Sequence, residues 1–414
     1  MFQPVRGTHD LYGEECQKHL KVIETAREIT QWYGYDEIIT PIFEFEGVFH
    51  RLGETSDVVS KETYTFTDRG GDSLTLRPEC TAPVVRAAIS NGLTQQLPLK
   101  FFYAGSMFRY DRPQKGRFRQ FEQVGVELCG VSEPQGDVEV IALAAHILER
   151  LGLSGRVILE INTLGDMESR NAYREALVSY FKRYTSSLSK ESLERLEKNP
   201  LRILDSKDKK DQEIVREAPV FNEFLSHLSK AHFEDVLKSL ELLKISYKIN
   251  RKLVRGLDYY CHTAFEFISD ELGAQGTVLA GGRYDGLFKM MEGPDLSGVG
   301  WAAGVQRLML LSHLTLAQKS LVALVPLGEV AEAQALILAQ QLRKQGIAVD
   351  LGFSGNMSKR LKRAHKMEAQ WAIILGEDEI REHVALARNL VSGEQTKIPL
   401  SQLAEYLLVE RSPS

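Results

Sequence analysis

The sequence predicts an α+β fold followed by a smaller α/β domain. Strand-like segments recur through the first part of the chain without a helix between each pair, a pattern that favours an antiparallel sheet over a doubly wound one. A charged, helix-rich stretch at about 168–250 interrupts these strands. From residue 321 strands and helices alternate, which is typical of a small α/β domain. We therefore expect one domain at 1–318, with the helical insertion inside it, and a second domain at 319–414.

The first domain is expected to begin with an amphipathic helix. Apolar residues recur at helical spacing between Glu14 and Tyr33, and the pattern ends before Gly34. The segment 38–43 has the composition of a strand, but Pro41 cannot donate a ladder hydrogen bond, which predicts an edge or an interface. Further strands are predicted at 64–66, 73–76, 101–110, 118–129, 264–268 and 277–279.

The insertion and the C-terminal domain differ in texture. Helix formers and charges dominate the insertion, most clearly at 189–198 and 207–216. The C-terminal domain is expected to have strands at 321–328, 347–351 and 371–375 and a helix at 331–344. Between its last two predicted strands, basic residues stud a second helix and form either a solvated face or a contact with phosphates. These residues are Lys359, Arg360, Lys362, Arg363 and Lys366.

The composition excludes several classes of protein. With 43% hydrophobic and 26% charged residues, the chain resembles an ordinary globular protein. A formal net charge of −5 excludes a general polyanion binder, so any nucleic acid must meet a local basic patch. We expect neither a secretory signal nor a membrane-spanning run. The 4 cysteines are dispersed, without CxxC or zinc spacing, which favours a reducing cytoplasm and predicts no structural metal site.

One short stretch contains most of the candidate site. Its basic residues are Arg109, Arg112, Lys115, Arg117 and Arg119. Phe121, Gln123 and Glu127 follow with the same strand parity as the last two arginines, and Gly125 is the single gap, so one strand face is predicted to carry them. Guanidinium groups bind phosphate oxygens as a fork, and an aromatic ring stacks on a base. The pattern therefore indicates a polyphosphate held beside a small polar substrate, unless the basic run is a solvated loop.

Other candidates have simpler explanations when each is taken alone. Arg255 precedes a glycine, so it is either a cation aimed into a cleft by a tight turn or a surface arginine. Glu79 either binds a ligand or is an acid favoured at a helix N-terminus. Arg307 follows a strand–turn–helix pattern and either binds a ligand or lies exposed. Tyr259 and Tyr260 would point to opposite faces of a strand, which predicts at least one of them in the core.

Taken together, five segments resemble the histidyl-tRNA synthetase family of class IIa aminoacyl-tRNA synthetases. In chain order they are LRPECTAPVVRA at 76–87, FRYDRPQKGRFRQFEQ at 108–123, RGLDYY at 255–260, LAGGRYDGL at 279–287 and GVGWAAGVQRL at 298–308. The second and fifth resemble class II motifs 2 and 3, and the third and fourth resemble the histidine-specific signatures. The helix and the proline-interrupted strand near the N-terminus are similar to motif 1. The resemblance covers nearly the whole chain.

The resemblance implies a catalytic pair and a histidine pocket. Arg109 and Arg255 are implied to bind the reacting α-phosphate and to stabilise the charge that grows in the transition state. The implied histidine-binding residues are Glu79, Thr81, Arg109, Gln123, Glu127, Arg255, Tyr259 and Tyr260. Among these, Glu79, Thr81 and Gln123 would hold the α-ammonium group. Glu127 would accept a hydrogen bond from the imidazole, so the pocket should reject side chains that lack ring N–H groups.

Nucleotide and tRNA contacts are implied in the same way. ATP would contact Arg109, Asp111, Phe121 and Arg307, with Phe121 stacked on adenine and Arg307 at the γ-phosphate. Arg112 and Gln114 would read the acceptor end of the tRNA.

The chain departs from the family pattern at a few positions. Asp111 stands where Glu is commoner, which would lengthen or hydrate a contact to the adenine amino group. Glu122 stands where His is usual, on the opposite strand face from Gln123. Cys261 and His262 stand where Asn and Arg are frequent. None of these positions is among the residues implied to be catalytic.

The implied reaction is the ATP- and Mg²⁺-dependent activation of L-histidine to histidyl-adenylate, followed by transfer to the 3′ end of tRNA(His). A homodimer, a C-terminal anticodon-binding domain, a cytoplasmic location and no membrane contact are implied as well. One alternative is the regulatory subunit of ATP phosphoribosyltransferase, which typically lacks the C-terminal domain and these arginines. Another is a prolyl, threonyl or glycyl enzyme of class IIa, which lacks RGLDYY together with GGRYDGL.

Overall fold

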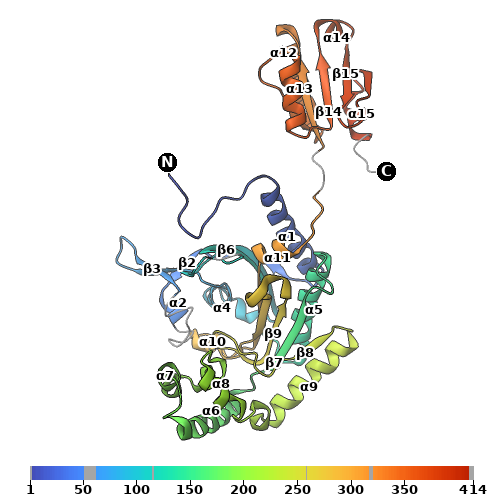
Figure 1. Ribbon diagram of the computed structural model, residues 1–414. Helices are drawn as coiled ribbons and strands as arrows, with labels where there is room; N and C mark the ends of the chain where they lie inside the picture. Colours follow the sequence, from blue (N-terminus) through green and yellow to red (C-terminus); the bar gives the residue numbers. More distant parts are fainter. Residues whose placement is uncertain (1, 51–61, 114–115, 258, 317–319, 410–414) are drawn as a thin grey trace. The chain divides into compact units, whose positions relative to one another are not determined.

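The computed structural model describes residues 2–50, 62–113, 116–257, 259–316 and 320–409 (Figure 1). It divides into two compact units, Met1–Leu314 and Thr315–Ser414. Each unit has its own hydrophobic core. Among the described residues, no helix combines the length and the apolar character needed to cross a bilayer.

An eight-stranded sheet forms the centre of the first unit, with strand order β1-β5-β6-β11-β10-β9-β7-β8. The strands from β5 to β7 in this order pair antiparallel, which confirms the expected antiparallel sheet. The edge strands β1 and β8 pair parallel to their neighbours, a feature that the sequence did not predict. The strands are β1 (Asp36–Glu37), β5 (Leu99–Phe108), β6 (Gln120–Cys129), β11 (Gly298–Gly304), β10 (Thr277–Arg283), β9 (Cys261–Ile268), β7 (Ile158–Thr163) and β8 (Tyr247–Ile249).

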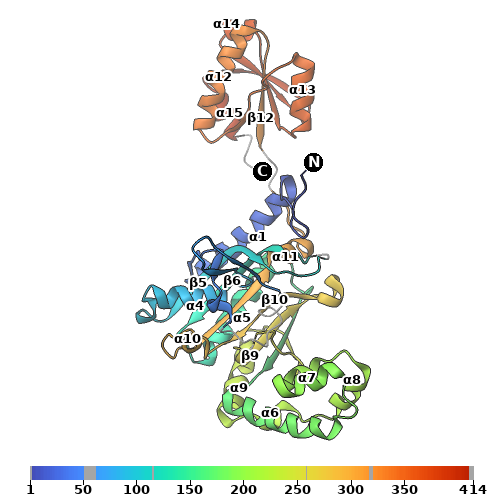
Figure 2. The same cartoon turned by 90° about the vertical axis from the view of Figure 1, so that its left-hand side faces the viewer.

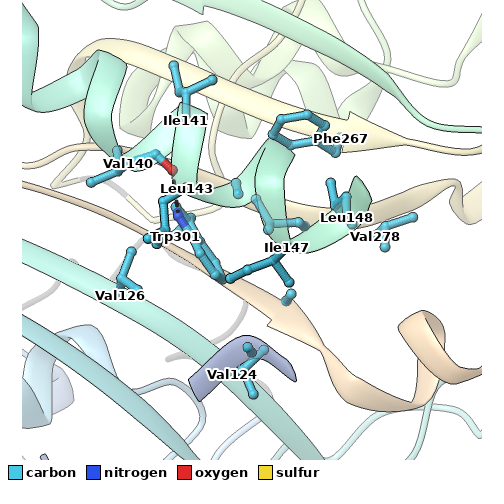
Figure 3. Packing of buried hydrophobic residues seen from close by; sticks show 14 of the residues in the cluster. Val124, Val126, Val140, Ile141, Leu143, Ile147, Leu148, Phe267, Val278 and Trp301 are labelled. Atoms are coloured by element: carbon cyan, nitrogen blue, oxygen red, sulfur yellow. Dashed lines mark hydrogen bonds between the residues drawn. The ribbon is translucent and has the colours of Figure 1, made fainter. Parts of the chain in front are cut away.

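One face of this sheet is covered by helices. Alternate residues of β6, including Val124 and Val126, pack there against apolar side chains of the helices. Figure 3 shows Trp301 of β11 at the centre of this core, where its indole Nε1–H donates to the backbone oxygen of Val140 at 2.8 Å. Because a buried indole N–H needs an acceptor, this bond fixes the helix against the sheet. The covering helices are α1 (Gly13–Trp32), α5 (Pro134–Arg150), α9 (His227–Leu242) and α11 (Val305–Leu311).

The opposite face carries smaller elements and the candidate site. A separate apolar cluster joins the helices of this face to Leu99, Cys129 and Tyr284. The helices are α2 (Gly47–His50), α4 (Thr81–Ser90) and α10 (Leu287–Met290), and η1 (Leu93–Gln95) follows α4. Segments before α4 in the sequence form a three-stranded antiparallel sheet. Its strands, in order, are β2 (Phe43–Phe45), β4 (Ser73–Leu76) and β3 (Tyr64–Thr67). The single strand predicted at 38–43 is wrong, because the chain around Pro41 forms no ladder and strands occur only on either side of it.

The insertion is helical, as predicted, and has a core of its own. Figure 2 shows α6 (Met167–Phe181), α7 (Lys190–Lys198) and α8 (Lys209–Arg216) gathered together away from the sheet. Buried Asp211 organises this group by accepting hydrogen bonds from the hydroxyls of Ser189, Ser192 and Ser206 at 2.6–2.7 Å. The chain returns through α9, and β8 already belongs to the central sheet. Short 3₁₀ segments complete this unit: η2 (Lys182–Tyr184), η3 (Pro200–Asp205), η4 (Phe221–Phe224) and η5 (Asp270–Gln275).

The second unit is a small α/β domain with a mixed five-stranded sheet of order β13-β12-β14-β15-β16. The first three strands of this order are parallel, and β15 and β16 are antiparallel. The basic cluster predicted on its second helix is only partly exposed, because Arg360 is buried, donates to the backbone oxygen of Pro326 and pairs with Glu332. The elements are β12 (Leu321–Pro326), α12 (Glu329–Lys344), β13 (Ala348–Asp350), α13 (Met357–Lys366), β14 (Trp371–Leu375), α14 (Glu377–Arg381), β15 (Val384–Asn389), β16 (Gln395–Pro399) and α15 (Leu403–Val409).

A buried ion pair ties α5 to the central sheet. The Arg283 guanidinium on β10 donates from Nε to both oxygens of Asp137, at 3.2 and 3.1 Å, and neither side chain is exposed. His232 of α9 lies 3.2 Å from the same carboxylate. Burial disfavours the Asp137 carboxylate, but the charge of Arg283 and the hydrogen bonds outweigh that cost and lower its pKa to about 2.

Replacing Asp137 with Asn should destabilise the first unit by about 3–5 kcal/mol, because Arg283 would remain buried without its counter-charge. Since the folded-state pKa is below the ordinary value of 3.8, the stabilising contribution of Asp137 is present above that pH and is lost as the pH falls towards 2. Urea unfolding between pH 7 and pH 2.5 should therefore show wild type and Asp137→Asn converging at acid pH. The exposed pair partner Asp235 on α9 provides the control, and equal losses for Asp235→Asn would contradict the assignment.

Candidate active site

A cavity of about 460 Å³ opens on the sheet face that carries α4. Its wall includes ten of the residues that the sequence predicted for binding or catalysis: Glu79, Thr81, Arg109, Asp111, Phe121, Gln123, Arg255, Tyr259, Tyr260 and Arg307. Glu127 lies behind this wall, Arg112 is exposed outside it, and Gln114 lies outside the described residues. Segments that are far apart in the sequence therefore meet at one site.

At one end of the cavity, Glu127 is fully buried on β6. Its Oε1 accepts the hydroxyl of Thr81 at 2.7 Å, and its Oε2 accepts the hydroxyl of Tyr284 at 2.5 Å. Glu79 stands at the start of α4 and accepts the backbone N–H groups of Thr81 and Ala82 at 2.6 and 3.0 Å. Glu79 is therefore a helix N-terminal acid and a cavity-lining carboxylate at once, so the two alternatives left by the sequence do not exclude each other.

Two glycines make room for this end of the site. A Cβ atom on Gly300 would collide with Oε2 of Glu127, which lies opposite it on the neighbouring strand. A Cβ atom on Gly125 would collide with the ring of Tyr103, its partner on β5. The gap at Gly125 in the predicted series on β6 thus has a steric cause. Tyr103 occupies that space and lines the cavity.

Burial favours the neutral form of the carboxyl groups of Glu127 and Glu79. Burial raises the pKa of Glu127 to about 8, and the nearby charge of Glu79 adds to the shift, against the hydrogen bonds from Tyr284 and Thr81. Burial also raises the pKa of Glu79. A cationic ligand would offset both costs, because an opposite charge within a few ångströms favours the ionised carboxylate.

Tyr259 and Tyr260 both line the cavity, with ring centroids 4.6 Å apart. The prediction that they point to opposite faces is wrong. They precede β9 in a turn, so the alternation of side chains along a strand does not apply to them. Both are buried, and their rings also pack into the apolar cluster around α4 and α10.

Arginine side chains line the same cavity, and the charge of Arg109 acts on the carboxylate of Glu79. The guanidinium carbon of Arg109 lies 5.3 Å from the centre of the Phe121 ring, and Nε of Arg109 donates to the backbone oxygen of Pro78 at 2.8 Å. Arg255 pairs with Glu266 and lies 5.2 Å from the Tyr260 ring centre. These contacts hold the guanidinium groups in fixed directions, which suits the recognition of phosphate oxygens.

Three of the cavity arginines, Arg307, Arg117 and Arg109, lie close enough to repel one another. Arg307, at the start of α11, donates from Nε to the backbone oxygen of Gly116 at 3.3 Å. Burial lowers the pKa of Arg307, and the charges of Arg117 and Arg109 lower it further. Because these partly buried guanidinium groups repel one another, the arrangement favours binding of a polyanion.

The sequence reasoning missed several residues of the wall. Glu266 links Arg255 to Thr277, whose hydroxyl donates to it at 2.8 Å. A lone carboxylate inside the apolar strand β9 was a usable signal for it. Tyr103 gave no such signal, because only the register with Gly125 reveals its place.

The predicted alternation along β6 is correct for Phe121 and Gln123, which line the cavity. Arg117 and Arg119 precede the strand, so parity cannot place them. Arg117 reaches the cavity and pairs with Asp111, whereas Arg119 lies 4.0 Å from the ring centre of Tyr110.

Comparisons with known proteins identify the family. Residues 7–308 match the family model described as "Histidyl-tRNA synthetase", and residues 321–410 match the one described as "Anticodon binding domain". The histidine–tRNA ligase of Rhodospirillum rubrum is 57% identical over 98% of each chain. The chain belongs to the histidyl-tRNA synthetase family.

Further relatives agree. The histidine–tRNA ligase of Gluconobacter oxydans is 52% identical over 99% of each chain. The crystal structure of apo histidyl-tRNA synthetase from S. aureus superposes with a TM-score of 0.84 at 35% identity, covering 98% of this chain and 100% of that one. Histidyl-tRNA synthetases are ATP-dependent ligases that join histidine to tRNA, so the predicted family, fold and enzyme class are confirmed.

The raised pKa of Glu127 predicts how the free energy of unfolding of the ligand-free chain depends on pH. Because the folded-state pKa of about 8 exceeds the ordinary 4.5, the group's contribution to stability is full below pH 4.5 and is lost as the pH rises through 8. Glu127→Gln removes this loss and should stabilise the ligand-free chain at pH 8.5 by on the order of a few kcal/mol, with little effect at pH 4.5. Urea unfolding at both pH values measures this. Exposed Glu149→Gln is the control, and a pH-independent difference would contradict the assignment.

Proposed function

We propose that Arg109 and Arg255 bind the α-phosphate of ATP while the carboxylate of histidine attacks it. The observation that carries this proposal is that Arg109 and Arg255 line the same cavity as the buried carboxylate of Glu79. A fixed cation stabilises the charge that develops on the phosphoryl oxygens during in-line displacement. The product is histidyl-adenylate, which then passes its histidyl group to the 3′ end of tRNA(His).

Histidine fits the part of the site that contains Glu79 and Glu127. Its α-ammonium group would bind Glu79, Thr81 and Gln123, and its imidazole N–H would bind Glu127. Support comes from buried polar atoms that find no hydrogen-bond partner within the described ranges: Oε1 of Gln123 and the hydroxyls of Tyr259 and Tyr103. Since an unsatisfied buried polar atom costs about 1–3 kcal/mol, a ligand that satisfies these atoms gains selectivity over one that does not.

ATP fits the part of the cavity that Phe121 and Arg307 line. Phe121 would stack on adenine, and Arg307 would bind the γ-phosphate. Asp111 lines the same wall and pairs with Arg117, and because its side chain is shorter than that of Glu, its contact with the adenine amino group would be lengthened or bridged by water.

The site also fits Mg²⁺. Glu266 supplies a carboxylate between Arg255 and Thr277 on the cavity wall, and Mg²⁺ is usually held by one or two carboxylates together with substrate phosphates. When bound, Mg²⁺ would neutralise phosphate charge.

Contacts with tRNA fall on basic surfaces. By resemblance to the family, Gln114 and the exposed Arg112 would read the acceptor end. The second unit would bind the anticodon, and its helix α13 presents Lys359, Lys362 and Lys366 to solvent. Such a surface suits phosphate contacts without base readout.

A homodimer is supported by an exposed apolar surface near Pro41. Ile39 is 86% exposed and Phe45 is 61% exposed, and Ile42, Phe43 and Phe66 are exposed as well. Apolar side chains gathered in this way mark an interaction site in a water-soluble fold. A second copy of this chain is the proposed occupant, because the segment resembles motif 1. The free thiols of Cys16, Cys80, Cys129 and Cys261 suit the cytoplasm as the location.

Arg255→Ala should slow histidine-dependent ATP–pyrophosphate exchange by about 10²–10³-fold, because it removes a cation that acts on the transition state. Histidine affinity, measured by calorimetry, should change far less. Arg255→Lys keeps the charge without the fork and should fall between the two. Exposed Arg251, in the same loop, is the control, and near-normal exchange in Arg255→Ala would remove this residue from catalysis.

Phe45→Asp should convert the dimer to monomers, because it buries a charge in the proposed interface. Sedimentation velocity at micromolar concentration measures the change. Leu242→Asp, at an apolar position on α9 that is 82% exposed, should leave the dimer intact. If wild type itself sediments as a monomer, the proposed dimer is wrong.

A further inference from the structure

Three side chains of metal-ligand type meet outside the cavity described above. The Sγ of Cys261, a ring nitrogen of His262 and a carboxylate oxygen of Asp285 all lie within 4.8 Å of one another. None of the proposed contacts to histidine, ATP or tRNA uses them. Asp285 follows Cys261 by 24 residues, so ligand spacing along the sequence gives no sign of this cluster.

An irregularity in the sheet brings the three residues together. Cys261 pairs with Arg283, whereas Ala264 pairs with Gly282, so the strand β9 contains extra residues at this point. His262 lies in this bulge with a φ of 44°, in the left-handed region that non-glycine residues seldom adopt. Bulges re-aim side chains and occur next to functional sites. Here the bulge directs His262 towards Asp285, just beyond the end of β10.

The polar atoms of the cluster are arranged as ligands. Nδ1 of His262 is buried and has no hydrogen-bond partner among the described residues. The Sγ of Cys261 accepts a hydrogen bond from the backbone N–H of Asp285 at 3.4 Å, which fixes the direction of the thiol. Oδ1 of Asp285 accepts hydrogen bonds from Nη1 of Arg283 at 3.1 Å and from the backbone N–H of Gly298 at 3.2 Å. These bonds orient the carboxylate and leave Oδ2 for a cation.

We propose that Cys261, His262 and Asp285 bind one Zn²⁺, with water at the fourth position. Thiolate, imidazole and carboxylate are the ligands of zinc, and three protein ligands with one open position form a common zinc geometry. A thiolate disfavours Mg²⁺ and Ca²⁺. Tetrahedral coordination needs ligand atoms about 3.5 Å apart, so small side-chain rotations close the site. The thiol releases its proton to solvent as the Zn–S bond forms.

The surroundings support this site. The Arg283 guanidinium would repel a cation, but Asp137 pairs with it from the other side. His232 bonds to Asp137, and its ring stacks on that of His262 with centroids 5.1 Å apart, which limits rotation of the ligand ring. Cys261 adjoins Tyr260, and Asp285 adjoins Tyr284. A bound metal would therefore cross-link the two segments that carry these phenols and stabilise the fold there.

Cobalt provides the decisive probe, because a Co²⁺–thiolate bond gives a charge-transfer band in the near ultraviolet. Untagged, reduced, metal-free full-length chain should develop this band on titration with Co²⁺ and lose it when one equivalent of Zn²⁺ is added. Cys261→Asn and His262→Arg should abolish the band. Far-ultraviolet circular dichroism of both variants checks that they fold. Cys16→Ser, at a half-buried thiol on α1, should keep it.

Asp285→Asn separates binding from structural support. The amide oxygen can still accept from Arg283 and Gly298, but the second ligand oxygen is lost. Zn²⁺ affinity, measured by competition with a chromophoric chelator, should fall by about 100-fold or more, whereas circular dichroism should not change. Zn²⁺ should raise the thermal midpoint of wild type and of Cys16→Ser only. The proposal is overturned if wild type gives no charge-transfer band, or if the band survives in Cys261→Asn.

Discussion

One buried carboxylate constrains most of the site. Glu127 has no exposed surface, and taking a carboxyl group out of water is costly unless donors meet both of its oxygens. The hydroxyls of Thr81 and Tyr284 meet them, and the absence of a side chain at Gly300 leaves room. The start of α4, the end of β10 and the middle of β11 are therefore fixed relative to β6. A ligand that brings an N–H group to Glu127 exploits this arrangement without further ordering of the protein.

The second constraint is the charge of the side chains around the cavity. Glu79 lines the wall and Glu127 lies behind it, and the guanidinium groups of Arg109, Arg117 and Arg307 line the wall as well. Burial and like charges oppose ionisation of Glu127 and of Arg307. In the binding mode proposed above, the ammonium and imidazole groups of histidine would offset the first effect, and the triphosphate of ATP would offset the second. Binding and positioning of the two substrates would then have the same electrostatic cause.

Local spacing predicted the parts of this site that regular structure controls. Strand parity placed Phe121 and Gln123 on the cavity face of β6 because β6 is a regular strand there. The same rule failed for Tyr259 and Tyr260, which lie in a turn, and could not place Arg117, which precedes the strand. Arg360 belongs to a basic helix, yet it is buried, because Pro326 and Glu332 meet it from another part of the domain. The burial of Arg360 thus depends on partners in distant segments, which sequence spacing does not encode.

Most of the departures from the family pattern lie away from the cavity. Glu122 faces away from the cavity and accepts the hydroxyl of Ser106, so a change there leaves the ligand contacts alone. Cys261 and His262 lie beyond the turn that carries the pocket tyrosines, in a bulge where side-chain identity is constrained by backbone shape rather than by substrate. Asp111 is the exception, since it lines the cavity and its charge pairs with Arg117. None of the proposed substrate contacts uses the bulge after Tyr260, so a new chemistry there would leave the proposed reaction undisturbed.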